Sequence, residues 1–234
     1  MFSYEQIQVA DNQDGFLFKG RPLFDRKFTQ VLKFHKEGLA AVADESGWFH
    51  ISLDGEPLYE KRFERTFGYY FGRSAVNDAG QWYHLDTKGK EAYSRRFAWC
   101  GNFQESLCTV RDFDNHYFHI DLKGEAVYSQ RYRYAGDFKD GVACVRLDDG
   151  LWQHIDPNGS QIHPMKYLDL GTFHKSFAVA RDEQGWMHID RSGQPVYQAR
   201  FRFVEPFYNG QALVDLLDGG KSVIDEYGKL LVLI

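Results

Sequence analysis

The chain has 234 residues, of which 43% are hydrophobic and 26% charged, and its formal net charge is −5. This composition is typical of a globular protein with enough apolar material for a core, and it excludes a disordered chain. The sequence contains no cluster of Lys and Arg. Because binding to a nucleic acid requires such a cluster, a nucleic acid is not expected as a partner.

The N-terminal segment, MFSYEQIQVADNQDG, has neither the basic nor the apolar region of a signal peptide. No apolar run approaches the ~20 residues that a membrane span needs. The three cysteines, Cys100, Cys108 and Cys144, show neither paired spacing nor a CxxC motif. They therefore predict neither a disulfide framework nor a zinc ribbon. We expect a cytoplasmic protein that binds no membrane.

Seven segments align along the chain, and each ends in a glycine. In chain order they are QDGFLFKG (13–20), WFHISLDG (48–55), WYHLDTKG (82–89), YFHIDLKG (117–124), WQHIDPNG (152–159), WMHIDRSG (186–193) and KSVIDEYG (221–228). Their closing glycines, spaced by 34 or 35 residues, are Gly20, Gly55, Gly89, Gly124, Gly159, Gly193 and Gly228. A period of this kind predicts one repeat domain over residues 1–234.

Each unit of the repeat is predicted to consist of short strands. A run of small residues and valine, such as LAAVAD, precedes a polar turn, the W-x-H-I-D stretch and the turn that ends in the glycine. That glycine is expected to have a positive φ. Pro22, Pro57 and Pro195 follow two residues later, where they fit the start or the edge of a strand. No stretch keeps a 3.6-residue period, so helix content should be very low.

Aromatic residues recur in the same register, and we interpret them as core. They lie four residues after the glycine (Phe24, Tyr59, Tyr93, Tyr128, Tyr197, with His163 as the exception), eight after it (such as Phe63 and Phe97) and fourteen after it (such as Phe103 and Phe173). Four of the five tryptophans, Trp48, Trp82, Trp152 and Trp186, lie seven before a glycine.

The pattern W-x-x-I-D-x-x-G, then [YF]-x-x-[RK]-[FY], then a valine-rich strand resembles the WG repeats of bacterial proteins. Trp186, Ile189, Asp190 and Gly193 match the motif, but the glycine that should follow the tryptophan is replaced by Phe49, Tyr83, Gln153 and Met187. The resemblance covers essentially the whole chain and implies a β-repeat architecture without a particular activity.

Units of three or four strands can close into a propeller or stack as an open β-solenoid of hairpins. The chain begins with a hairpin at residues 6–20 and ends with the apolar strand LLVLI, residues 230–234. Together these segments could build a seventh blade. We therefore predict an all-β fold, a seven-bladed β-propeller-like ring closed by the two termini, with the open solenoid as the alternative.

Five histidines share one repeat position: His50, His84, His119, His154 and His188. Equivalent residues of neighbouring blades lie roughly 10 Å apart, whereas the ligands of one zinc ion must lie within a few ångströms of each other. A structural hydrogen-bond network within each blade is therefore favoured over a metal site. The basic residues seven after each glycine, such as Arg62 and Arg200, are interpreted as structural partners of the aspartates three before it: Asp86, Asp121, Asp156, Asp190 and Asp225.

Function should depend on the positions where the repeats differ, because the copied residues build the scaffold. These positions are residues 99–102, 112–116, 148–149 and 163–165. No catalytic motif, cofactor site or metal site is predicted, so we expect no enzyme. The leading hypothesis is a scaffold that binds another protein, and the alternative is a lectin-like protein that binds a glycan.

Overall fold

A computed structural model describes residues 3–233 of the chain, and it is built from short antiparallel strands. In this described part the one helix is a single 3-10 turn, η1 (Tyr4–Gln6), whose N-terminus is capped by the side chain of Ser3. The very low helix content expected from the missing 3.6-residue period is confirmed. None of the described helices is long and apolar enough to cross a membrane.

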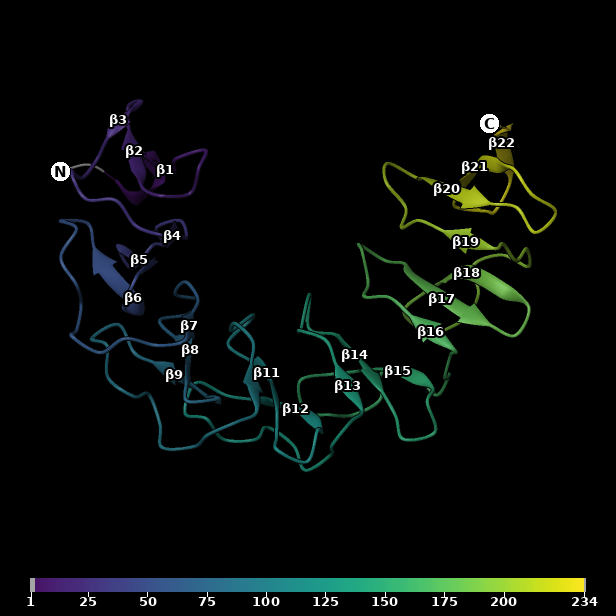
Figure 1. Ribbon diagram of the computed structural model, residues 1–234. Coiled ribbons are helices and arrows are strands. Elements are labelled where there is room, and N and C mark those ends of the chain that lie inside the picture. The colour runs from purple at the N-terminus through teal and green to yellow at the C-terminus, as the bar shows by residue number, and fades with distance from the viewer. Residues whose placement is uncertain (1–2, 234) are drawn as a thin grey trace. The chain divides into compact units, whose positions relative to one another are not determined.

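The strands form seven small sheets that follow one another along the chain (Figure 1). The first sheet consists of β1 (Ile7–Val9), β2 (Phe16–Phe18) and β3 (Arg21–Pro22), and the second of β4 (Gln30–Val31), β5 (Leu39–Asp44) and β6 (Gly47–Ser52). The next three are β7 (Arg65–Thr66), β8 (Ser74–Asp78) and β9 (Gln81–Leu85); β10 (Trp99–Cys100), β11 (Cys108–Arg111) and β12 (Tyr117–Ile120); and β13 (Tyr134–Ala135), β14 (Ala143–Arg146) and β15 (Trp152–Ile155). The last two are β16 (Asp169–Leu170), β17 (Ala178–Asp182) and β18 (Gly185–Ile189), and β19 (Phe203–Val204), β20 (Gln211–Asp215), β21 (Lys221–Asp225) and β22 (Leu230–Leu233).

Each of the central sheets has the same internal order. A two-residue strand pairs with the valine-rich strand, which pairs in turn with the W-x-H strand, as when Ala41 lies opposite His50. A single bridge beyond this last strand, such as Ile51 to Pro57 and Ile189 to Pro195, adds an outer edge. The prolines are thus at a sheet edge, as expected, because a proline has no N–H to donate to a further strand.

The anchor glycines close a tight turn. The N–H of Gly89 donates to the carbonyl oxygen of Asp86 at 3.0 Å, and Gly89 has φ +74°. All seven anchor glycines have a positive φ, between +74° and +82°. The positive φ predicted from the repeat is confirmed.

The C-terminal strand extends the last sheet. β22 pairs with β21, with Val223 opposite Val232, and is the fourth strand of that sheet. Residues 6–20 and 230–233 belong to different compact units, so the expected sharing of one sheet by these two segments stays a prediction; Ile234 lies outside the described residues. Closure of the seven sheets into a ring stays a prediction.

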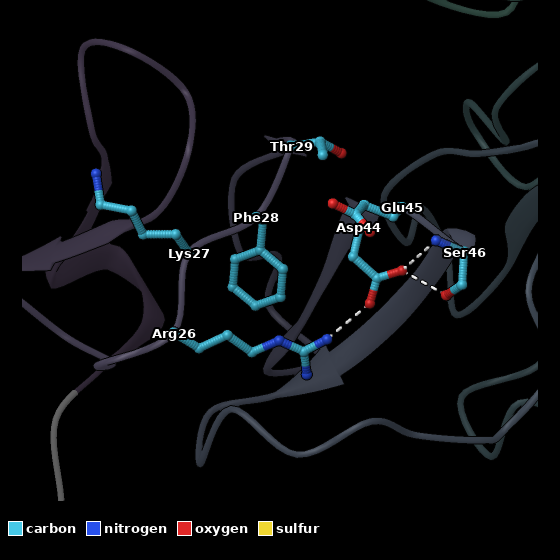
Figure 2. A pocket seen from close by; sticks show the side chains of 7 residues that line it. All are labelled: Arg26, Lys27, Phe28, Thr29, Asp44, Glu45 and Ser46. Carbon is cyan, nitrogen blue, oxygen red and sulfur yellow. Dashed lines mark hydrogen bonds and ion pairs between the residues drawn. The ribbon is translucent and has the colours of Figure 1, made fainter.

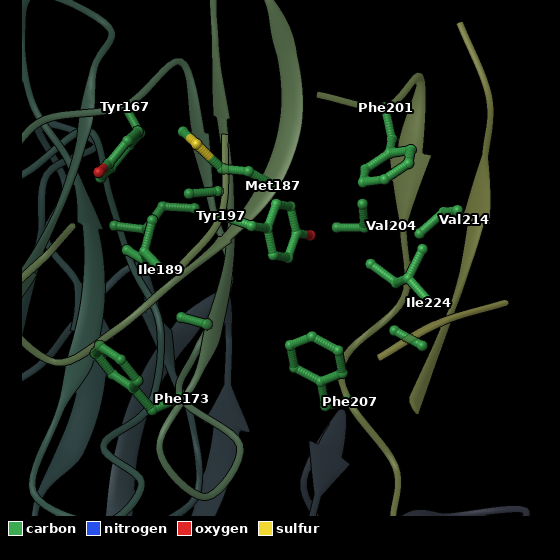
Figure 3. Close-up of a cluster of buried hydrophobic side chains, with 14 of the residues drawn as sticks. Tyr167, Phe173, Met187, Ile189, Tyr197, Phe201, Val204, Phe207, Val214 and Ile224 are labelled. Carbon is green, nitrogen blue, oxygen red and sulfur yellow. The ribbon is translucent and has the colours of Figure 1, made fainter. Parts of the chain in front are cut away.

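Contacts divide the chain into two compact units, Met1–Asn115 with His119–Ala126, and His116–Phe118 with Val127–Ile234. In the second unit the core includes Met187, Ile189, Tyr197 and Phe207, and Figure 3 shows Tyr197 between Ile189 and Val204. In the first unit Phe16, Phe34 and Phe49 belong to one cluster, and Trp48, Phe63 and Tyr83 to another. The aromatic positions that follow the anchor glycine are therefore core, as predicted. The single repeat domain over residues 1–234 stays a prediction.

Candidate functional site

The repeated histidine connects its sheet to the next one. His50, His84, His154 and His188 are fully buried. Their Nε2 atoms lie 2.8, 3.0, 2.9 and 2.9 Å from the backbone carbonyl oxygens of Phe67, Gly101, Gly171 and Glu205. Each acceptor lies 17 residues further along the chain, near the first strand of the following sheet. The histidine was expected to bridge groups within its own sheet; that expectation is corrected, because the acceptor belongs to the next sheet.

The other ring nitrogen determines the tautomer. Nδ1 of His50 lies 2.5 Å from the hydroxyl of Tyr59, Nδ1 of His188 lies 2.5 Å from that of Tyr197, and His84 pairs with Tyr93 in the same way. Because a carbonyl oxygen can only accept, Nε2 carries the hydrogen, and Nδ1 accepts from the tyrosine. Burial lowers the pKa of these histidines to about 4. The imidazoles are neutral and both nitrogens are engaged, which suits a structural role.

The same tyrosines explain the anchor glycines. A Cβ atom at Gly124 would lie 2.5 Å from Cγ of Tyr93, and one at Gly228 would lie 2.6 Å from Cγ of Tyr197. Each glycine thus lets the aromatic ring of the preceding unit lie directly on its backbone. At Gly20, the first anchor, no atom lies within 4 Å of the equivalent position. The repeated Gly, Tyr and His therefore form one joint between consecutive units.

His163 occupies the tyrosine position of this joint. Its Nε2 lies 2.9 Å from Nδ1 of His154, whose own Nε2–H donates to the carbonyl oxygen of Gly171. His163 must therefore donate through Nε2, which leaves its Nδ1 as an acceptor. A histidine at this position therefore keeps the hydrogen bond to His154, but its own Nδ1 atom is buried without a hydrogen-bond partner among the described residues.

The aspartates three before the glycine stabilise their own turn. Oδ1 of Asp86 accepts from the N–H groups of Lys88 and Lys90, both at 2.9 Å, and Oδ1 of Asp225 accepts from those of Tyr227 and Lys229 in the same way. Asp121, Asp156 and Asp190 repeat this arrangement. They were expected to pair with the basic residues seven after the glycine. That expectation is wrong for Arg62 and Arg200, because Arg62 contacts Phe49 and the carbonyl of Glu60 and Arg200 pairs with Asp182.

The basic residues have other structural partners. The Arg62 guanidinium lies 3.7 Å from the centroid of the Phe49 ring and donates to the carbonyl of Glu60 at 2.7 Å. Arg96 and Arg131 cover Tyr83 and Phe118 at 3.8 and 3.7 Å. Stacking of a guanidinium on an aromatic face is favourable, and it shields the covered ring from solvent.

The cysteines behave as small core residues. Cys100, Cys108 and Cys144 are free and buried, and the Cys108 thiol donates to the carbonyl oxygen of Gly101 at 3.3 Å. Burial raises the pKa of the Cys144 thiol to about 12. A thiol of this kind is a poor nucleophile at neutral pH. Among residues 3–233, no group of three or more His, Cys, Asp and Glu side chains is placed to hold a metal ion.

Figure 2 shows a pocket of about 530 Å³ in the first unit, lined by residues 26–29 and 44–46. Its charges are mostly paired: Arg26 lies 2.7 Å from Asp44, and Lys27 lies 2.7 Å from Asp14 outside the pocket. Asp44 also accepts from the backbone N–H of Ser46 at 2.9 Å. The pocket thus offers polar groups to a ligand without a net excess of either charge.

The four variable segments differ in their exposure. His163 is buried, and in the segment at residues 99–102 Cys100 is fully buried. Phe113 is exposed, and Asp148 pairs with Arg133 at 2.8 Å. A role of these segments in binding stays a prediction.

A set of exposed aromatic rings was missed by the sequence reasoning. In the second unit Tyr134 lies 5.4 Å from Tyr117 and 5.5 Å from Trp152, as ring centroids, and these three residues are named the aromatic ladder. The pairing recurs between Trp186 and Phe203 at 5.7 Å. Tyr134 and Phe203 are 43% and 46% exposed, and Trp152 and Trp186 are half-buried. The tryptophans were interpreted as core; Trp48 is buried, and Trp152 and Trp186 pack against the core of the second unit while part of each ring stays exposed.

Two parts of the chain match a family of repeats. The family model described as "WG containing repeat" matches residues 119–152 and 186–216. These two repeats of the chain are thus similar to WG containing repeats. In these repeats the residue after the tryptophan is a large side chain, and the first unit explains why glycine is dispensable there: Phe49 is fully buried beneath Arg62. Among curated proteins, none matches the chain.

Solved structures share the fold over nearly the whole chain. The computationally designed Ika8 protein is 14% identical, with a TM-score of 0.51, and the match covers 97% of this chain and 85% of Ika8. BamB from Moraxella catarrhalis is 12% identical, with a TM-score of 0.51 and coverage of 94% and 76%. KlHsv2 with its loop 6CD replaced by a Gly-Ser linker is 7% identical, with a TM-score of 0.50 and coverage of 92% and 88%. BamB and Hsv2 are β-propellers, so the chain has a propeller-like all-β fold, as predicted.

Proposed function

We propose that the protein is a non-catalytic scaffold that binds another protein through the aromatic ladder and the neighbouring Trp186–Phe203 pair. The observation that carries this proposal is the exposure of Tyr134 and Phe203 on short strands whose sheets are backed by a packed core. Tyrosine and tryptophan are the residues most often responsible for binding energy at protein interfaces. A rigid sheet presents them at little entropic cost.

The hydrogen-bond partners of the repeated polar residues favour a binding protein over an enzyme. The buried histidines use both ring nitrogens inside the joints, and each turn aspartate uses Oδ1 to accept two backbone N–H groups of its own turn. A general base needs a free lone pair that can reach a substrate. The copied residues therefore serve the scaffold, and the exposed rings remain for recognition.

The test compares two double variants of the full chain. Tyr134→Ser with Phe203→Ser removes the exposed rings, and Leu217→Ser with Tyr227→Ser changes two exposed residues that stack on no tryptophan. Partners are captured from the source cells, purified, and titrated against both variants by calorimetry. We expect a stoichiometric protein partner whose affinity falls about tenfold or more with the first variant alone. If the partner binds both variants with equal affinity, the proposed role of the aromatic ladder in binding is wrong.

A lectin-like function is the alternative, favoured by the pocket in Figure 2. Its Arg26–Asp44 pair offers both donors and acceptors to sugar hydroxyls beside the Phe28 ring. A glycan array tests it: saccharide binding that is lost with Asp44→Asn and kept with the ladder variant would favour the lectin. An enzyme built on the same frame ranks third.

A further inference from the structure

One repeated turn contains a residue that does not suit it. The turns before the valine-rich strands have central residues with positive φ, such as Asp140 and Gly141 (52° and 72°) or Asn209 and Gly210 (50° and 77°). Asp-Gly and Asn-Gly are the preferred pairs in such turns. The equivalent pair in the first unit is Phe71 and Gly72, with φ of 52° and 69°.

Phe71 is unfavourable here for two reasons. A bulky L-residue with positive φ pays a backbone cost that asparagine largely avoids. Its ring is also 43% exposed, so burial does not compensate for that cost. Strain of this kind persists mainly where it serves recognition. The turn would form more readily with asparagine, and the phenylalanine therefore points to a ligand.

Phe71 lines a pocket of about 310 Å³ formed by two consecutive turns and η1, named the turn pocket. Its other lining side chains include Tyr4, Lys33, His35, Lys36 and Tyr70. Two of them, His35 and Tyr70, pack edge to face at 4.6 Å. A Cβ atom at Gly68 would lie 2.1 Å from Nε2 of His35, so the imidazole lies tightly against that backbone. The aromatic walls are thus preformed.

Cationic groups are in excess at the turn pocket. Lys33 and Lys36 form no ion pair within residues 3–233, although the chain carries a net charge of −5. The Lys36 ammonium lies 5.4 Å from the centroid of the Phe71 ring. The His35 ring makes no hydrogen bond in the described chain and can donate one. No carboxylate is among the side chains that line the pocket, but Glu37 lies beside it, where its Oε1 accepts from the backbone N–H of Gly72 at 3.2 Å, so cationic groups are in excess there rather than alone. Two ammonium groups and an imidazole beside aromatic rings complement a carboxylate that is attached to an apolar group.

A second copy of the motif provides an internal comparison. Phe173, His174 and Lys175 repeat the sequence of Phe34, His35 and Lys36, and a pocket of about 300 Å³ adjoins them. That pocket contains Glu226, and Asn209 replaces the phenylalanine. Its lining thus includes a carboxylate, and the positive φ that Phe71 adopts in the first unit is adopted here by Asn209, which tolerates it. Binding is therefore expected at the turn pocket alone.

We propose that the turn pocket binds an acidic peptide segment of a protein partner, with a Glu or Asp carboxylate between Lys33 and Lys36 and a neighbouring apolar side chain against Phe71 and Tyr70. A volume of about 310 Å³ is at the small end of ligand pockets and suits one or two side chains. This proposal rests on the proposed function as a protein-binding scaffold and adds the chemistry of the bound segment.

The test uses a fluorescein-labelled peptide in which Glu and Phe alternate, with a Gln-for-Glu peptide as its control. Fluorescence anisotropy with the full chain should show binding to the acidic peptide that weakens with salt, and binding to the control peptide that is about tenfold weaker. Lys33→Gln with Lys36→Gln should cost about tenfold in affinity, whereas Lys175→Gln should cost nothing. Phe71→Asn should abolish binding while raising the melting temperature, because it relieves the turn.

Several outcomes would overturn the proposal. Equal binding by wild type, Phe71→Asn and the double lysine variant would exclude the turn pocket, as would binding of inorganic phosphate or a neutral saccharide there without the peptide. If the peptide fails to bind but a captured partner still depends on the aromatic ladder, this proposal is wrong and the proposed function stands. If the peptide binds and the ladder variant retains every partner, the proposed role of the aromatic ladder is wrong, whereas the proposed role of the turn pocket is supported.

Discussion

The Nε2–H of His188 donates to the backbone carbonyl of Glu205 at 2.9 Å, although 17 residues separate the two in sequence. The bond joins the last residues of one sheet to the first strand of the next, and the His188 ring also stacks on Phe207 at 3.9 Å. Because each central unit repeats this arrangement, the buried histidines determine how neighbouring sheets pack rather than what the protein binds.

Removing the tyrosine hydroxyl from one joint should destabilise the protein. Tyr197→Phe leaves Nδ1 of the fully buried His188 without its donor, which should lower the free energy of unfolding by about 1–3 kcal/mol. The control is Tyr227→Phe, because Tyr227 is 84% exposed and should tolerate the change. Urea unfolding of both variants measures the difference, and equal midpoints would show that the joint contributes nothing.

Stability should fall as the pH is lowered from about 6.5 toward 4. The buried histidines, His50, His84, His154 and His188, have a pKa of about 4 in the folded state, against an ordinary value of 6.5. Between these values the unfolded chain binds protons that the folded chain does not, so protonation favours unfolding. Each histidine should contribute a loss of about 1 kcal/mol per pH unit in this window.

The control for this pH dependence is His188→Gln, whose amide can still donate to the carbonyl of Glu205 but cannot titrate. The slope of the urea midpoint against pH should be smaller in this variant, by the amount that one histidine contributes in the wild type. A midpoint that is constant from pH 7 to pH 4.5 would contradict the neutral, buried state of the histidines.

Restoring the repeat tyrosine at residue 163 should stabilise the protein. His163→Tyr replaces a ring with an orphaned, buried Nδ1 by one whose hydroxyl can donate to His154, as Tyr197 does to His188. A gain of about 1 kcal/mol is expected, as for other consensus substitutions. The reverse change, Tyr197→His, should lose stability. Calorimetric melts of both variants test the pair, and the prediction is wrong if both shifts have the same sign.

The anchor glycines should differ in their tolerance of alanine. Gly20 and Gly124 have almost the same φ, +75° and +78°, so both variants carry the same backbone strain of about 1 kcal/mol. Only at Gly124 would the new Cβ lie 2.5 Å from the Tyr93 ring. Gly124→Ala should therefore cost several kcal/mol more than Gly20→Ala by chemical denaturation. Similar losses would mean that the ring moves aside freely.

Much of the architecture follows from the sequence alone. The spacing of the anchor glycines, the all-β character, the positive φ of the turns and the aromatic core are local or periodic properties, so each unit repeats the same information. The recurrence of His, Gly and Tyr at fixed offsets also identifies the residues that build the joints. These inferences needed no knowledge of which sheet contacts which.

Partners and exposure were decided only by the tertiary structure. The sequence assigned the histidines to partners in their own sheet and the basic residues to the turn aspartates, whereas His188 reaches Glu205 and Arg62 covers Phe49. The side of a strand that faces solvent depends on how the next sheet packs, so the exposure of Tyr134 could not be deduced from its repeat position. The strain at Phe71 was equally hidden, because a positive φ at that residue exists only once the turn is closed by the strands on either side.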